Sequence, residues 1–213
     1  MGAMNSSSCL LRRPGGFDIT DTALKNCSFR HGAKILDIGC GSGATVNYMN
    51  DVMALDAVGI DIEPAGQSDR SNIIKASAGD IPFPGLSFDG IITECSFSLM
   101  SEPERVLEEC HRVLKEKGRI IISDMYARGN PAVFNGTLGR LDTKEAIISL
   151  LQKKGFFIEL FEDHTHALQT MWGQMIFDMG AASFHHSLGV TPGDLKKVKC
   201  GYYLLVACKT VTR

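Results

Sequence analysis

The sequence predicts an α/β fold in which a mostly parallel sheet of seven strands is covered by helices on both faces. Short, nearly continuous apolar segments alternate with segments of helical pattern, as expected for strands that are buried on both faces. The first apolar segment runs into a loop with glycine at every second position, which is a typical link between a strand and a helix. The length of 213 residues and the hydrophobic content of 44% suit one globular domain.

The first half of the chain is expected to supply four strands. Residues 18–28 have the pattern of a short amphipathic helix, and residues 34–38 form a buried apolar run. The glycine loop then opens a helix at residues 44–50. The three further strands are expected at residues 57–61, 72–76 and 88–94.

The second half begins with the clearest helix signals in the chain. Residues 102–117 start near Pro103, carry acidic residues in the first turns and basic residues in the last, and are followed by Gly118. Residues 119–125 form the fifth apolar run. The remaining elements are a helix at residues 142–153 and strands at residues 156–162 and 202–208. We expect the last strand to be antiparallel.

We expect one domain over residues 1–213, because the chain has no internal repeat and no low-complexity linker. Residues 1–30 are expected to form a helical cover at the N-terminal side. Residues 163–199 separate the last two strands, contain a helix-like pattern and are expected to form an insertion. Loops that long inside a compact domain are usually functional, so we expect a lid or a substrate-binding segment.

Composition and charge bear on the partners and the location of the protein. The formal net charge of -2 gives no electrostatic case for a nucleic acid or a membrane surface as partner. No apolar run approaches the roughly 20 residues of a membrane helix. The seven cysteines are scattered without a C-x-x-C pair, which indicates reduced thiols in a cytoplasmic protein rather than a disulfide or zinc framework. The sequence does not specify the oligomeric state.

The segment KILDIGCGSGATV, residues 34–46, is the strongest pointer to chemistry. Its glycines allow an abrupt turn and a close approach of a ligand to the backbone, and the helix that follows offers free N–H groups. Asp61 lies 22 residues after Gly39, at the expected end of the second strand. A carboxylate there can accept hydrogen bonds from both hydroxyls of a ribose. These features predict a nucleoside-containing cofactor at the carboxyl ends of the strands.

The glycines alone leave two cofactor classes open. Gly39, Gly41 and Ala44 match the G-x-G-x-x-A pattern of dinucleotide sites, so a nicotinamide-dependent oxidoreductase is one alternative. Asp37 favours a ligand with a positive charge, such as an ammonium or a sulfonium, over a pyrophosphate. The chain also lacks a Tyr-x-x-x-Lys pair and a second domain for a dehydrogenase substrate.

Four segments in order carry a family resemblance: ILDIGCGSG, GIDIEP, SAGDIPFPGLSFDGIITE and VLEECHRVLKEKGRIIISDM. Together they resemble the class I S-adenosylmethionine-dependent methyltransferases, and most of all the ubiquinone and menaquinone C-methyltransferases and the arsenite methyltransferases. The resemblance implies a Rossmann-like fold, S-adenosyl-L-methionine as cofactor, S-adenosyl-L-homocysteine as product, and methyl transfer to a small-molecule acceptor. A protein that binds this cofactor without turnover is the second alternative.

The resemblance also implies which residues contact the cofactor. Asp37 and the backbone from Gly39 to Gly41 would hold its methionine end. Asp61 would bind the ribose hydroxyls, and Ile62 would pack on the adenine. The cofactor-binding residues implied are Asp37, Gly39, Cys40, Gly41, Asp61, Ile62, Ser77, Ala78, Asp80, Ile81 and Glu94.

The adenine edge departs from the family pattern. Relatives often read Gly-Asp-Ala-Glu before Leu-Pro-Phe, whereas residues 76–79 read Ala-Ser-Ala-Gly here and Asp80 follows. The contact at this edge is therefore either Ser77 with the backbone of Ala78, or Asp80 if the loop shifts.

The candidate catalytic residues are Glu94, Cys95, His164 and His166. The resemblance places the first two beside the sulfonium methyl group. Cys95 is interpreted as a residue that lines the pocket, with a nucleophilic role as the alternative. The histidines follow the sixth strand. Each could act as a general base, line the acceptor site or cap a helix. A sulfonium already activates its methyl group, so the protein has mainly to align a methyl acceptor, which can lower a barrier by about 7–11 kcal/mol.

Two further segments bear on the site. Met171, Met175 and Met179 recur every four residues of the insertion, which indicates either core packing or a lid over an apolar methyl acceptor. At the N-terminal side the resemblance implies that Arg13 could meet the methionine carboxylate and that Phe17 could cover the pocket. No metal site is predicted, because no histidine, cysteine or carboxylate set shows a ligand spacing.

Overall fold

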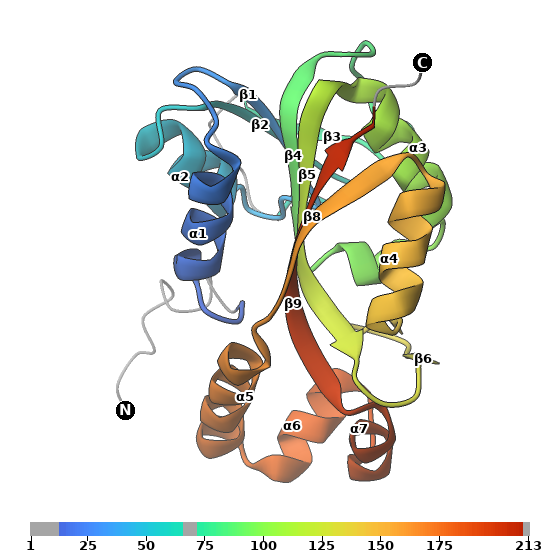
Figure 1. The fold of residues 1–213 in the computed structure, drawn as a ribbon. Helices are drawn as coiled ribbons and strands as arrows, with labels where there is room; N and C mark the ends of the chain where they lie inside the picture. Colours follow the sequence, from blue (N-terminus) through green and yellow to red (C-terminus); the bar gives the residue numbers. More distant parts are fainter. Residues whose placement is uncertain (1–12, 66–71, 211–213) are drawn as a thin grey trace.

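The computed structural model describes residues 13–65 and 72–210 of the chain (Figure 1). Residues 1–12 of the expected N-terminal cover lie outside the described residues. The strands are β1 (Lys34–Ile38), β2 (Asp56–Asp61), β3 (Ile73–Lys75), β4 (Phe88–Glu94), β5 (Leu114–Ala127), β6 (Ala132–Val133), β7 (Arg140–Leu141), β8 (Phe156–Asp163) and β9 (Cys200–Lys209). The helices are α1 (Phe17–Cys27), α2 (Ala44–Asp51), the 3-10 turn η2 (Phe97–Leu99), α3 (Pro103–Val113), α4 (Lys144–Lys153), α5 (Thr165–Met179), α6 (Ala181–Leu188) and α7 (Pro192–Val198).

Seven strands form one sheet in the order β3-β2-β1-β4-β5-β9-β8. Strands β1 to β5 pair in parallel, and β9 runs antiparallel to both of its neighbours. The predicted Rossmann-like sheet, with its antiparallel last strand and its helical insertion, is confirmed. Because parallel strands end at the same edge, the loops after β1, β2 and β4 meet there.

Helices cover both faces of the sheet (Figure 1). Leu107 of α3 and Leu151 of α4 are buried in the core of one face. Leu24 of α1, Met49 of α2 and Leu168 of α5 are buried in the core of the other. This double cover explains why the central strands are nearly continuous apolar runs.

The structure corrects two details of the prediction. The helix expected at residues 102–117 ends at Val113, because Leu114 is extended and pairs with Phe88 at the start of β4. Strand β5 is therefore longer than the expected 119–125. The short pair of β6 and β7 was not predicted, since two residues per strand leave no periodic pattern.

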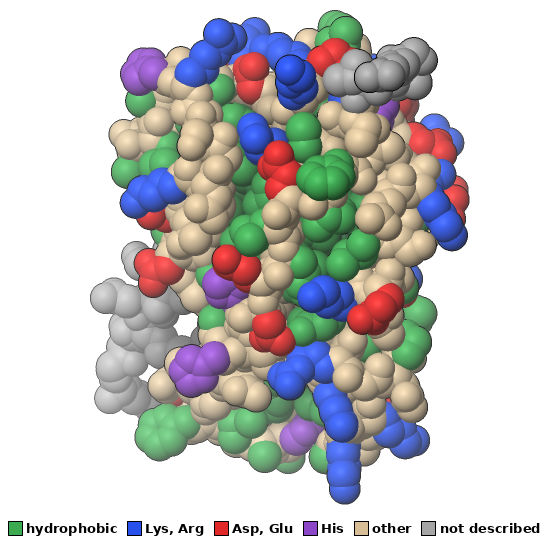
Figure 2. All heavy atoms as spheres, viewed as in Figure 1, with side chains coloured by type: hydrophobic (Ala, Val, Ile, Leu, Met, Phe, Trp, Pro, Cys, Tyr) green, Lys and Arg blue, Asp and Glu red, His purple; other side chains and the backbone are tan. Residues whose placement is uncertain are grey.

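The insertion forms three helices, α5 to α7, beyond the carboxyl ends of the sheet, at the bottom of Figure 1. It starts after β8 and ends before β9, and these strands pair there, with Asp163 opposite Tyr203. Among the described residues, none of the helices has the length and apolar character to cross a bilayer. The face seen in Figure 2 intersperses basic and acidic side chains with apolar ones.

Candidate cofactor and active site

The glycine loop joins β1 to α2 through three left-handed residues. Gly39, Gly41 and Gly43 have φ angles of 74°, 53° and 77°, a region that favours glycine. A Cβ on Gly39 would lie 2.5 Å from the Ser96 side chain, whereas a Cβ on Gly41 would meet no described atom within 4 Å. The Gly41 N–H donates to Asp61 Oδ2 over 2.8 Å. The loop is thus closely packed at its first glycine and open at its second.

A cavity of ≈ 410 Å³ lies at the carboxyl ends of β1, β2 and β4. Its apolar wall includes the side chains of Ile62 and Leu99, which are 66% and 50% exposed. Exposed apolar side chains beside a cavity favour the burial of a flat aromatic ring. Six of the predicted residues lie in the wall: Gly39, Asp61, Ile62, Ser77, Ala78 and Cys95.

The other predicted residues lie outside this wall. The Cys40 side chain packs against β2, where it would clash with a Cβ on Gly59. Ile81 is buried in the core of the face that α3 covers. Ser77 and Asp80, the two candidates for the adenine edge, are both exposed, but only Ser77 lies in the cavity wall.

Asp37 lies on β1, just before the glycine loop, and is only 3% exposed. Burial raises the pKa of its carboxyl well above the usual range, the carboxylate of Glu94 raises it further, and Arg13 lowers it. Within the described residues, no hydrogen bond reaches this carboxylate. A buried carboxylate without a partner is costly, so this position favours a ligand that brings a positive charge.

Glu94, at the end of β4, is fully engaged by donors from three separate segments. Its Oε1 accepts from Thr20 of α1 at 2.6 Å, and its Oε2 accepts from Thr45 of α2 at 2.7 Å. The same Oε2 forms an ion pair with Arg13. Glu94 therefore ties α1 and α2 to the sheet and does not line the cavity. Sequence analysis missed both threonines; the available signal was Thr45, directly after the glycine loop.

Arg13 forms this ion pair through Nη1, while another nitrogen of its guanidinium has no partner among the described residues. Its Nε donates to the Gly16 carbonyl at 3.0 Å, and its guanidinium lies 4.4 Å from the ring centroid of Phe17. Its Nη2 atom is buried and has no hydrogen-bond partner among the described residues. Phe17 in turn stacks on Tyr48 of α2. The start of α1 thus carries an unpaired donor close to the buried acid of Asp37.

Cys95 follows Glu94 and reaches the cavity from a left-handed backbone, with φ of 51°. Its thiol lies 3.3 Å from the Tyr202 hydroxyl, which donates to the Ser123 carbonyl at the same distance. Burial raises the pKa of this thiol to about 12. The thiol is therefore neutral near pH 7, which favours a role in lining the cavity over a nucleophilic one.

The two predicted histidines lie outside the cavity wall. His164 is the residue before α5, and its Nε2 lies 3.2 Å from Glu162 Oε2. His166 is exposed on the first turn of α5. The structure does not bring either ring together with Glu94 or Cys95. Among the described residues, no group of three or more histidine, cysteine or acidic side chains could hold a metal ion.

The three methionines of the insertion, Met171, Met175 and Met179, pack against two different apolar clusters. Met171 and Trp172 join the apolar cluster that includes Cys95. Met175 and Met179 pack with α6, as Trp172 also does. Gly15, two residues before α1, lies close to α5, because a Cβ added at Gly15 would be 3.6 Å from Ala167 Cβ. The insertion is therefore packed, and its first helix shares an apolar cluster with Cys95, which lines the cavity.

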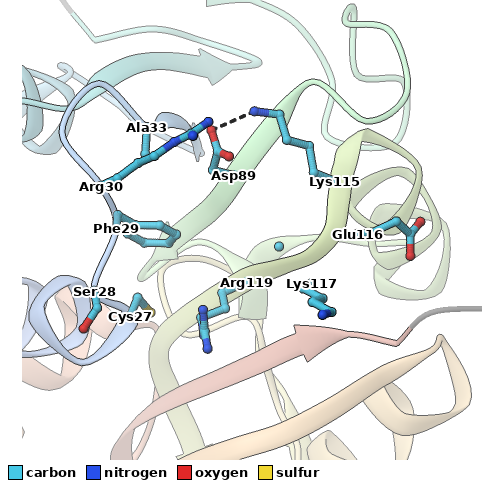
Figure 3. Close-up of a pocket in the computed structure, with 11 residues that line it drawn as sticks. Cys27, Ser28, Phe29, Arg30, Ala33, Asp89, Lys115, Glu116, Lys117 and Arg119 are labelled. Carbon is cyan, nitrogen blue, oxygen red and sulfur yellow. Dashed lines mark hydrogen bonds and ion pairs between the residues drawn. The ribbon is translucent and has the colours of Figure 1, made fainter.

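A second cavity, of ≈ 300 Å³, lies at the opposite end of β4 and β5 (Figure 3). Basic side chains line it, but they are largely matched by acids. Asp89 forms an ion pair with Lys115 at 2.8 Å, and Arg119 pairs with Glu159 at 2.7 Å. This largely paired surface is remote from the glycine loop.

Comparisons with known proteins identify relatives of the chain. Residues 36–122 match the family described as "Methyltransferase domain". The chain is 27% identical over 227 residues to 27-O-demethylrifamycin SV methyltransferase of Amycolatopsis mediterranei (strain S699), and the match covers 90% of this chain and 82% of that protein. The chain spans 66%, 34% and 57% of the length of three other curated relatives.

Two solved structures share the fold. The [4+2]-cyclase SpnF superposes with a TM-score of 0.70 at 25% identity, over 91% of this chain and 80% of that one. Phosphoethanolamine N-methyltransferase 2 of Haemonchus contortus, in complex with S-adenosyl-L-methionine, gives a TM-score of 0.75 at 17% identity, over 93% of this chain and 54% of that one. At 17% identity, the similarity to the Haemonchus structure shows a shared fold alone.

Proposed function

We propose that this chain, which belongs to the class I S-adenosylmethionine-dependent methyltransferases, transfers the methyl group of S-adenosyl-L-methionine to a small-molecule acceptor. The membership rests on the matching domain family, on the relatives and on the shared fold. These comparisons favour a methyltransferase over a nicotinamide-dependent oxidoreductase. S-adenosyl-L-homocysteine is then the product.

One observation carries the proposal: a buried acid without a hydrogen bond and one unpaired guanidinium nitrogen lie beside an open glycine. Asp37 offers a carboxylate without a hydrogen bond, and Arg13 offers the buried Nη2. At Gly41 the backbone faces open space. The methionine end of the cofactor carries an ammonium and a carboxylate, so these residues fit it. We place it there, with the ammonium toward Asp37 and the carboxylate toward Arg13.

The rest of the cofactor follows the cavity wall. Asp61 would accept the ribose hydroxyls; its carboxylate is oriented by the N–H groups of Gly41 and Glu63, each at 2.8 Å. Ile62 and Leu99 would flank the adenine, with Ser77 at its edge. The bound cofactor supplies an activated methyl group, and these residues bind it, orient it and exclude water.

The methyl acceptor is proposed to be an apolar small molecule that enters between the start of α1 and the insertion. Cys95 lines the cavity and belongs to the same apolar cluster as Met171 and Trp172 of α5. The named substrate of the Amycolatopsis relative is also a small molecule. We propose that α5 acts as a lid over the methyl acceptor, as helices beside strand ends often do.

Catalysis is proposed to proceed by alignment of the methyl acceptor, without a general base from the predicted set. The Glu94 carboxylate is saturated by three donors, and the Cys95 thiol is neutral. His164 and His166 lie outside the cavity wall. The reactive atom of the methyl acceptor should therefore be nucleophilic at neutral pH without help.

We also propose a cytoplasmic location. Six cysteines in the described part of the chain are free thiols. Free thiols are typical of a reducing compartment, which supports this placement.

The test is a calorimetric titration with S-adenosyl-L-methionine, S-adenosyl-L-homocysteine and NADH in parallel. We expect binding of the first two and no binding of NADH. The radiolabelled methyl cofactor is then incubated with apolar aromatic amines, thioethers and acidic phenols, which are nucleophilic at neutral pH, and transfer to one of them would establish the activity. Binding of NADH alone would overturn the proposal, and cofactor binding without transfer to any compound would favour a protein that binds without turnover.

A further inference from the structure

Asp124 is a buried acid that the proposed reaction does not use. It lies near the carboxyl end of β5 and is 1% exposed. Its Oδ2 accepts from the Ser98 N–H at 2.8 Å, and its Oδ1 accepts from the Ser98 hydroxyl at 3.0 Å. The same Oδ1 accepts from the Met125 N–H at 2.7 Å. Both carboxylate oxygens are therefore engaged, two of these three bonds come from Ser98, and the Phe97 backbone N–H also interacts with the carboxylate.

Ser98 is the centre of the turn η2, which helps to build the cofactor cavity. Ser96, Leu99 and Met100, on both sides of Ser98, lie in the cavity wall. The far end of the turn is held separately, because Arg140 Nη1 donates to the Met100 carbonyl at 3.2 Å. Asp124 is thus the anchor beneath this wall, on the side away from the ligand.

We propose that Asp124 is a positioning residue of the cofactor site: its ionised carboxylate holds the turn that forms one wall of the cavity, and its protonation loosens that wall. The inference rests on the proposed function and deepens it, because it makes cofactor affinity depend on a group that does not touch the cofactor.

The chemistry of the anchor supports this role. A carboxylate oxygen that gains a proton becomes a donor, so it no longer accepts as it does in the ionised form. Burial raises the pKa of Asp124 to about 6, while the bonds from Ser98 and Met125 oppose that rise. Protonation therefore occurs in an accessible pH range. The titratable and charged groups around Asp124 and the small adjoining cavity are Cys95, Tyr202, Tyr203, Arg140 and Asp142.

The test is a titration of S-adenosyl-L-homocysteine into the unaltered chain and into Asp124→Asn, at pH 7.5 and at pH 5.0. The amide nitrogen of asparagine cannot accept a hydrogen bond, so at pH 7.5 we expect Kd to rise about ten-fold or more. At pH 5.0 the two proteins should differ much less, because Asp124 is then largely protonated in the unaltered chain. Any effect of pH on Asp37 is common to both proteins and cancels in this ratio.

Asp89→Asn is the matched control. The Asp89 carboxylate also accepts a backbone N–H, from Lys34 at 2.9 Å, but it lies at the opposite end of the sheet (Figure 3). This change should leave the affinity for S-adenosyl-L-homocysteine unaltered. An equal ratio of Kd values at both pH values, or an unchanged Kd in Asp124→Asn, would overturn the inference.

A second measurement needs no variant. The side-chain carboxyl carbon of Asp124 is followed by NMR in the unaltered chain, with and without S-adenosyl-L-homocysteine. If the cofactor site prefers the ionised form, binding must lower the pKa of this group by reciprocity. A pKa that does not move on binding would refute the coupling. Failure of the unaltered chain to bind S-adenosyl-L-homocysteine at all would instead overturn the proposed function, and this inference with it.

Discussion

The Asp37 carboxyl illustrates how one residue can be unfavourable for the ligand-free fold and suited to a ligand. It is buried beside a second carboxylate, that of Glu94, and shares the positive charge of Arg13 with it. Its raised pKa means that the folded chain holds a proton there that the unfolded chain releases. The ionised form is therefore favourable only when a ligand brings a cation to it.

We expect Asp37→Asn to raise the Tm of the ligand-free chain near pH 8 and to change it little near pH 4. A carboxyl whose pKa is raised by folding contributes its full stability below the unfolded value of about 3.9, and that stability is lost as the pH rises through the folded value. Asparagine does not titrate and avoids this loss. Thermal unfolding at the two pH values checks the prediction, and an equal shift at both would contradict it.

Asp61 gives a prediction about binding rather than stability. Asp61→Asn should weaken the binding of S-adenosyl-L-homocysteine by about ten- to a hundred-fold, because a charged hydrogen-bond acceptor for the ribose is lost, at roughly 1.5–3 kcal/mol. Calorimetry measures the change. Asp56→Asn is the control: it lies at the other end of the same strand, is exposed and should bind normally. Wild-type affinity in Asp61→Asn would mean that the ribose lies elsewhere.

How far the site could be predicted depends on the distance along the chain. The glycine loop and Asp61 follow from local patterns, since both lie at the ends of consecutive strands. The partners of Glu94 do not: Arg13, Thr20 and Thr45 come from positions 81, 74 and 49 residues away. No local pattern links these segments, so the sequence could not predict that Glu94 anchors two helices.

At the scale of elements, the junction at Glu94 determines how α1 and α2 are held. The Arg13 and Glu94 side chains are 13% and 8% exposed, whereas those of the surface pair Arg119 and Glu159 are 34% and 31% exposed. Removing one partner of a buried pair leaves an uncompensated charge, but a surface pair contributes little. The two pairs therefore offer a direct comparison.

We expect Glu94→Gln to lower the free energy of unfolding by at least about 2 kcal/mol, and Glu159→Gln to lower it by less than about 1 kcal/mol. Urea unfolding of both variants measures this difference. If Glu94 were a general base, its variant would lose methyl transfer while keeping its stability, and that result would refute the anchoring role.

The element boundaries show the same division between local and distant causes. Helix α4 lies close to the expected residues 142–153, because Thr143 caps its start and Gly155 follows its end. The end of α3 was misjudged, because helix-forming residues at 114–117 are drawn into the sheet by the pairing of Leu114 with Phe88. Tertiary pairing overrides local propensity there.

For the whole molecule, the sheet separates two cores with different relations to the site. Leu24→Ala in α1 and Leu151→Ala in α4 remove fully buried side chains from opposite faces. Each should cost about 2–5 kcal/mol of stability. Only Leu24→Ala should also weaken the binding of S-adenosyl-L-homocysteine several-fold, because α1 carries Phe17 and Thr20. Urea unfolding and calorimetry on both variants test this, and equal affinities would show that the two faces are equivalent for the site.

The insertion leaves and rejoins the sheet at one place, where Asp163 lies opposite Tyr203 on paired strands. Opposed residues of such strands have Cα atoms about 5 Å apart. The 36 residues between β8 and β9 thus leave the sheet and return to it at neighbouring positions. A segment attached in this way can be exchanged as a unit. If the insertion covers the methyl acceptor, as proposed, substrate preference can change while the seven strands and the loops at their ends stay as they are.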